Sequence, residues 1–177
     1  MNREILFKAK RKSWKELPKE EWWVEGYLFD DGMPEPKHYF IGGIIVKPYE
    51  GTACDKWNVV GIDFCEIDIN TICQYTGLTD KNDKKIWEND ILKFNDEIWY
   101  SCYTSCGTEY DSWEAENYGV VGYCDYSARY NFTKYKYNEN QVEADLHKNH
   151  DIEFSEFVKE HEAIGNIFDN PELVEVE

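Results

Sequence analysis

Short runs of alternating apolar and polar residues, typical of β-strands, recur along most of this chain. Residues 3–14 alternate in this way, and residues 38–49 form a second strand pattern. In that second pattern, Gly42 and Gly43 indicate a bulge or a tight bend. Further runs follow at DILKFN, EIWYSCY, YGVVGYCDY and RYNFTKYKY, with turn residues between them. This spacing predicts a sandwich or a small barrel.

One segment, near residues 154–161, has a helical pattern instead. Phe154, Phe157 and Val158 give it a short apolar face. Ser155 can cap its N-terminus, although Val158 stands where a full capping box has Glu. We therefore expect a mainly β protein with one short helix.

The stretch QYTGLTDKNDKKIWENDILKF, residues 74–94, contains the beginning of a calcium-loop pattern. Asp80 and Asn82 supply oxygen ligands at the first and third positions of an EF-hand loop. The fifth position is Lys84, a cation, and the sixth is Lys85 where the loop needs glycine. The twelfth is Ile91 instead of glutamate. The calcium interpretation therefore fails.

A pair of turns explains the same stretch better. Asn82 and Asp83 tolerate the positive φ that tight turns require, and Asn89 does so before Asp90 and the next apolar run. We expect these four residues to have a structural role, in a double turn that leads into a strand.

Residues 74–94 also resemble the signature of YopX-family proteins of bacteriophages and prophages. NREILFKAK, near the N-terminus, is similar to the opening strand of that family, and AIGNIFDNPELV to its closing block. Asp83 and Asn89 depart from the family pattern, which usually has glycine there. Both replacements belong to residue types that tolerate left-handed backbone, so the turns can be kept.

The resemblance implies a mainly β protein with an SH3-like barrel in its C-terminal part. It implies no catalytic residues, because the family has no established activity. We expect an N-terminal β-rich region at 1–73 and a barrel domain at 74–177. The region from about Trp99 to Asn149 matches nothing distinctive.

Net charge is the strongest feature of the composition. The chain has 36 acidic and 19 basic residues, a formal net charge of −17, and residues 51–177 account for all of it. An acidic body of this kind repels phosphate backbones, so we expect no direct nucleic-acid binding by it. No apolar run is long enough for a membrane helix, and MNREILFKAKRK lacks the apolar region of a signal peptide. We expect a cytoplasmic protein, in the host cell if phage-encoded.

Basic residues gather at the N-terminal end instead. Alternation places Lys8, Lys10 and Lys12 on one face of the first strand, opposite Phe7. This pattern allows contact with nucleic acid, but it is also how an edge strand resists pairing with other chains. We favour the edge-strand interpretation.

Two short-range pairs are zinc candidates, Cys102 with Cys106 and His147 with His150. Their spacings lie outside the commonest structural zinc motifs, so we expect incidental thiols and solvated histidines, and no metal or cofactor. Motifs of nucleophilic hydrolases, phosphate loops and zinc proteases are missing from the sequence, so we expect no enzyme.

Two functions of different classes remain. The first is a non-enzymatic phage accessory protein that acts through protein–protein contacts or self-association, because aromatic residues are abundant and favour interfaces. The alternative is an acidic DNA mimic that inhibits a host nucleic-acid-binding enzyme by electrostatic attraction to its basic cleft.

Overall fold

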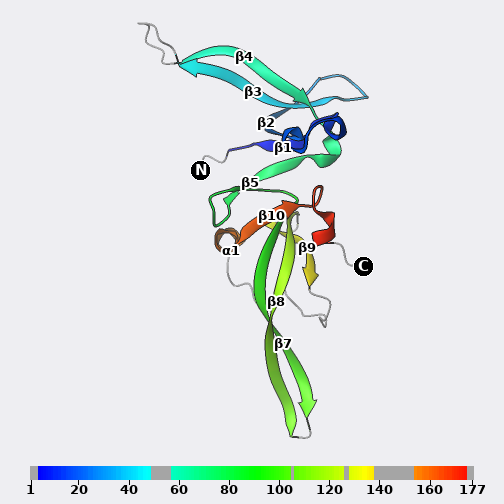
Figure 1. Ribbon diagram of the computed structural model, residues 1–177, viewed down its shortest axis with the longest axis vertical. Helices are drawn as coiled ribbons and strands as arrows, with labels where there is room; N and C mark the ends of the chain where they lie inside the picture. Colours follow the sequence, from blue (N-terminus) through cyan, green and yellow to red (C-terminus); the bar gives the residue numbers. More distant parts are fainter. Residues whose placement is uncertain (1–3, 49–56, 105, 126–127, 138–153, 175–177) are drawn as a thin grey trace. The chain divides into compact units, whose positions relative to one another are not determined.

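The computed structural model describes residues 4–48, 57–104, 106–125, 128–137 and 154–174 (Figure 1). The chain divides into two compact units, Met1–Tyr75 and Thr76–Glu177. The sequence had placed the boundary between residues 73 and 74. Each unit is built mainly of antiparallel strands, so the mainly β class is confirmed.

The first unit is an antiparallel sheet with the strand order β4-β3-β2-β1-β5. Its strands are β1 (Phe7–Lys10), β2 (Trp23–Asp30), β3 (Tyr39–Pro48), β4 (Trp57–Glu66) and β5 (Cys73–Thr79). Short 3-10 turns lie between them, at Trp14–Glu16, Lys19–Glu21 and Ile69–Thr71. β5 crosses the boundary between the units, and its next neighbour in the ladder is β6 (Lys85–Trp87).

The edge-strand prediction for the N-terminal segment is wrong. β1 lies inside the sheet, where Phe7 is paired with Gly26 of β2 on one side and with Gln74 of β5 on the other. One face of β1 belongs to the core of this unit, in which Ala9, Ile41 and Ile67 are buried. The lysines on its other face therefore need an explanation other than edge protection.

The two glycines of β3 do not form the expected bulge. Gly42 and Gly43 pair in regular register with Phe64 and Asp63, and the register shifts later, between Ile45 and Val46. A Cβ on Gly42 would lie 1.9 Å from the backbone oxygen of Asp63. Glycine is needed at position 42 because the neighbouring strand approaches so closely.

The second unit holds a four-stranded antiparallel sheet in the order β10-β7-β8-β9. Its elements are β7 (Asp90–Thr104), β8 (Gly107–Cys124), β9 (Arg129–Tyr137), α1 (Phe154–Glu160), β10 (Glu162–Asn166) and a 3-10 turn, η5 (Pro171–Leu173). The helix expected near 154–161 is confirmed. DILKFN and EIWYSCY, which the sequence separated, are one continuous strand, β7.

β7 and β8 form one long hairpin, paired from Ile91 with Val120 to Thr104 with Gly107 (Figure 1). The described strands of this unit do not close into a barrel. β10 pairs with only the first residues of β7, and β9 lies at the opposite edge of the sheet. Closure would need the two edge strands to meet, and no such ladder joins them in the described residues.

The core of the second unit lies between this sheet and α1. Leu92 of β7, Val121 of β8, Val158 of α1 and Ala163 of β10 are buried together, with Ile86 of β6. Three aromatic side chains extend this core: the ring of Phe94 stacks on Phe132 at 5.3 Å and meets Phe157 edge-on at 5.2 Å. Burial of the apolar face of α1 explains why a helix of only seven residues forms here.

Candidate interaction surface

The carboxylate that opens the failed calcium pattern binds backbone amides. Asp80 is 3% exposed. Its Oδ1 accepts hydrogen bonds from the backbone N–H groups of Asn82 at 2.8 Å and Lys84 at 3.0 Å. Its Oδ2 accepts one from the N–H of Ala163 in β10 at 3.2 Å. Both carboxylate oxygens are thus engaged in holding the turn.

Electrostatics in this turn favour the ionised carboxylate. Burial raises the pKa of Asp80, but the amides of Asn82, Lys84 and Ala163, together with the charge of Lys84, lower it more. The pKa therefore lies below its ordinary value of 3.8. The negative charge of Asp80 is part of the folded structure.

The same turn covers the outer edge of β10. The backbone N–H of Lys81 donates to the oxygen of His161 at 3.0 Å, and Lys84 Nζ donates to the oxygen of Ala163 at 3.3 Å. With the bond from Ala163 to Asp80, these contacts satisfy backbone groups that an open strand edge would expose. The turn protects the edge of the sheet.

The backbone geometry agrees with a structural double turn. Asp83 has φ of 60° and Asn89 has φ of 66°, whereas Asn82 has no positive φ. Asp90 Oδ2 accepts a hydrogen bond from the N–H of Trp87 at 2.9 Å. The N–H of Asn89 donates to the oxygen of Val121 at 2.8 Å. Each of these contacts is within the protein.

The zinc candidates fall in two different parts of the chain. Cys102 lies in β7, opposite Glu109, and Cys106 is exposed just before β8. His147 and His150 lie outside the described residues. Within the described ranges, no three side chains of the metal-ligating types come together. The expectation that these pairs bind no metal stays a prediction.

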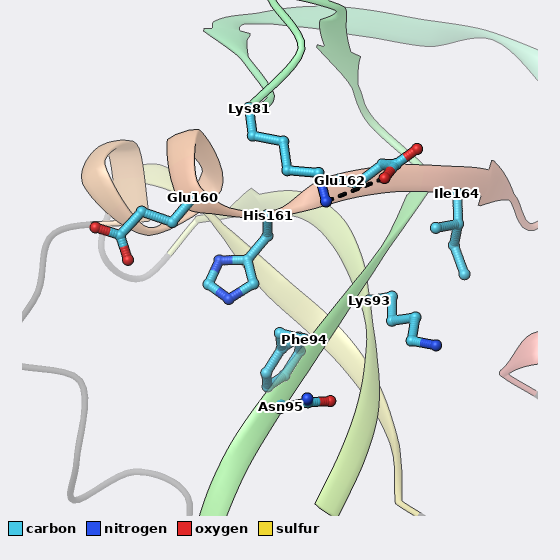
Figure 2. A pocket seen from close by; sticks show the side chains of 8 residues that line it. All are labelled: Lys81, Lys93, Phe94, Asn95, Glu160, His161, Glu162 and Ile164. Carbon is cyan, nitrogen blue, oxygen red and sulfur yellow. Dashed lines mark ion pairs between the residues drawn. The ribbon is translucent and has the colours of Figure 1, made fainter.

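An open pocket of about 460 Å³ lies in the second unit (Figure 2). Its lining residues come from the turn, β7, the end of α1 and β10: Lys81, Lys93, Phe94, Asn95, Glu160, His161, Glu162 and Ile164. Figure 2 shows Lys81 reaching across to Glu162, at 3.1 Å, while Glu160 points away from the other side chains.

The polar groups of this pocket serve structural contacts. Lys93 Nζ lies 2.5 Å from a carboxylate oxygen of Glu116, and this hydrogen bond is the main reason that the pKa of Lys93 is raised. The ring of His161 stacks on Phe157 at 4.1 Å, and its Nδ1 lies 2.7 Å from the Phe157 oxygen and so donates to it. The pocket does not direct several polar groups at one point, as a small-ligand site does.

The basic residues of the N-terminal segment are engaged inside the first unit. Lys10 is 1% exposed, and its Nζ lies 4.0 Å from the ring centre of Trp14 and 4.6 Å from that of Trp22. Such a position is favourable because the faces of aromatic rings attract cations. Lys12 Nζ pairs with Glu66 at 2.7 Å. Lys10 is thus part of the packing of this unit, and Lys12 is paired with an acidic side chain.

A contiguous apolar surface lies on one face of β2, β3 and β4, and we call it the β2–β4 face. Strand register places its residues in rows: Phe29 beside Phe40, Tyr27 beside Gly42 and Phe64, and Ile44 beside Ile62. The exposed fractions are 53% for Tyr27, 43% for Phe29, 65% for Ile44, 62% for Ile62 and 46% for Phe64. The opposite face of the same strands packs on the core through Leu28 and Ile41.

Comparison with known proteins places the chain in a family. The sequence model described as YopX protein matches residues 35–175. The chain belongs to the YopX family. No curated protein matches it. Among solved structures, the chain is similar to protein EF1440 from Enterococcus faecalis, with 19% identity and a TM-score of 0.45, over 98% of this chain and 100% of that one.

Membership in the YopX family agrees with the structural role of the signature turn. The match includes the Asp80 turn and β10, which the hydrogen bonds described above join. In the described part of this YopX protein, no helix is long and apolar enough to cross a membrane.

Sequence reasoning missed the β2–β4 face. It named no exposed apolar surface, yet FIGGIIV in β3 and VVGIDF in β4 are apolar at both odd and even positions. Such a strand is normally covered on both faces. Among the described residues of this YopX protein, a core lies against one face of β2–β4. The apolar residues at both odd and even positions were the signal that could have revealed the second, exposed apolar face.

Proposed function

We propose that this chain is a non-enzymatic accessory protein of a bacteriophage or prophage, that it acts in the host cytoplasm, and that it works through protein–protein contacts made by the β2–β4 face. The observation that carries the proposal is the exposure of five large apolar side chains on one sheet face. Single exposed apolar residues are ordinary, but a contiguous patch marks an interaction site.

The composition of the face supports protein binding. Tyr27, Phe29 and Phe64 are of the aromatic types enriched at interface centres, and the rings of Phe29 and Phe64 already pack edge-on at 4.9 Å. Side chains held in place before binding lose little conformational entropy when a partner arrives. The face is therefore organised for binding in the uncomplexed chain.

Site-specific photo-cross-linking in cells tests this function. A photoreactive residue is placed at position 62, within the face, and at position 5 as the control. Ile5 is 58% exposed in the same unit and lies outside the face. We expect a discrete cross-linked protein product from position 62 and none from position 5. Equal or absent products at the two positions would overturn the proposal.

A DNA-mimic action is the second candidate, and the distribution of charge favours it. Residues 76–177 hold 23 acidic and nine basic residues, so the second unit carries most of the net negative charge of the chain. Attraction of this unit to a basic cleft would weaken steeply with added salt. The test is inhibition of host DNA-processing enzymes in an extract at low and high salt; unchanged activity at every dose contradicts it.

A further inference from the structure

We infer that the partner on the β2–β4 face is a second copy of this chain, so that two copies associate face to face about a two-fold axis. This inference rests on the proposed function, because it names the protein that the same surface binds.

Charge is the first argument. Residues 1–75 hold ten basic and 13 acidic residues, whereas residues 76–177 hold nine and 23. Two copies of a chain with net charge −17 repel each other, and the repulsion is least where the nearly neutral first unit forms the contact. The β2–β4 face lies entirely in that unit.

Two carboxylates beside the face are already paired with basic side chains. Glu66 continues the row of Phe29 and Phe40, and it pairs with Lys12 at 2.7 Å and with His38 at 2.8 Å. Asp30, at the end of β2, lies 3.6 Å from Lys37. These paired carboxylates therefore offer little attraction to a basic partner. An uncharged apolar surface fits the face better, and the same face of a second copy is such a surface.

The arrangement of side chains is self-complementary. Rings lie at one end of the face, the Ile44–Ile62 pair lies at the other, and Gly42 leaves a low point between Tyr27 and Phe64. In an isologous contact, a residue away from the two-fold axis meets a different residue of the other copy. A two-fold axis near Gly42 places the rings of one copy over the isoleucines of the other, which avoids ring-on-ring crowding.

The size of the patch indicates a modest affinity. Aromatic side chains bury about 150–250 Å² each. Five side chains about half exposed thus offer roughly 400–500 Å² per copy, and a two-fold contact roughly 800–1,000 Å² in total, at the low end for specific interfaces. We therefore expect a monomer–dimer equilibrium that depends on protein concentration.

Sedimentation velocity of the full chain over a wide concentration range tests the inference. We expect a shift from 21.0 kDa toward twice that mass as the concentration rises. Ile62→Asp and Ile62→Lys should both abolish the shift, since either charge would be buried without a partner. Ile44→Asp is a second variant with the same expectation, and Ile5→Asp, the matched control, should associate like wild type.

Salt and the cross-linked product separate the alternatives. Added salt should leave the dimer intact or strengthen it, because the contact is apolar. A wild-type chain that stays monomeric, or Ile62 variants that dimerise like the Ile5 control, would overturn the inference. If the chain is monomeric and position 62 cross-links to a different protein, the second copy is excluded while the proposed function stands. If position 62 gives no discrete product, both fail.

Discussion

The Asp80 carboxylate accepts a hydrogen bond from the backbone N–H of Ala163, 83 residues further along the chain, at 3.2 Å. Asp80 stands in the turn after β5, and Ala163 in the edge strand β10. The bond joins two of the sequence blocks that resemble the YopX family. It also converts an exposed strand edge into a closed one, which gives the turn a role in stability and in resistance to aggregation.

Replacing Asp80 with asparagine should destabilise the protein by about 2–3 kcal/mol at neutral pH. An amide has one acceptor oxygen, so at least one backbone N–H at the turn loses its partner. Asp83→Asn is the matched control, because Asp83 is exposed and asparagine accepts its positive φ. Urea unfolding measures both variants; equal stability of Asp80→Asn and Asp83→Asn would contradict the role of the carboxylate.

The contribution of Asp80 should depend on pH. In the folded state the pKa of Asp80 lies below the ordinary value of 3.8, so the ionised form stabilises the fold. That stability is fully present above about pH 4 and is lost as the pH falls through the lower folded value. Urea midpoints measured from neutral to acidic pH should show the difference between wild type and Asp80→Asn shrinking on acidification. A difference that stays constant would argue against the lowered pKa.

Position 83 should prefer glycine to alanine. At φ of 60° a Cβ is strained, and Asp83→Ala should cost about 1 kcal/mol. Asp83→Gly, which restores the residue usual in the family, should leave stability within about 0.5 kcal/mol of wild type. The two substitutions remove the same carboxylate, so their difference in thermal unfolding isolates the backbone effect. Equal stability of Asp83→Ala and Asp83→Gly would mean that the backbone of the turn shifts to accommodate the alanine Cβ.

Truncation of Lys10 should be costly although lysine is normally a surface residue. Lys10→Ala removes a buried stem and a cation held over Trp14 and Trp22, at a cost of about 2–4 kcal/mol. Lys15→Ala is the control, since Lys15 is exposed and 5.4 Å from the Trp14 ring centre, and it should change stability by less than about 0.5 kcal/mol. Unfolding followed by tryptophan fluorescence measures the stability of both variants. Similar losses of stability in Lys10→Ala and Lys15→Ala would contradict a role for Lys10 in the packing of the core.

Purified protein should contain less than stoichiometric zinc. The spacing of the cysteine and histidine pairs is outside the commonest structural motifs. Metal analysis of wild type tests this, with Cys106→Ser and Cys124→Ser as a pair of variants. Stoichiometric zinc that is lost in Cys106→Ser and kept in Cys124→Ser would contradict the expectation.

Features that depend on neighbours in the sequence could be predicted from it. Short runs typical of β-strands indicated several of the strands, and the short apolar face of residues 154–161 indicated α1. The residue types at 83 and 89 predicted left-handed backbone, as observed. The family could be recognised for the same reason, because its blocks are local patterns. These inferences need only side-chain propensity and the preferences of single φ angles.

The remaining features depend on which strands become neighbours, and this is decided by packing of the whole chain. Pairing on both sides of β1 made it an interior strand, so Lys10 became buried under tryptophan rings. In the sequence Asp80 resembles a metal ligand. In the structure β10 lies beside the turn, so Asp80 accepts a hydrogen bond from the N–H of Ala163. Within the described ranges, the core packs against one side of β2–β4, and Ile44 and Ile62 on the other side are exposed. Local chemistry specifies strands and turns, but burial is a property of the assembled sheet, because many of the residues that cover a side chain are distant from it in the sequence.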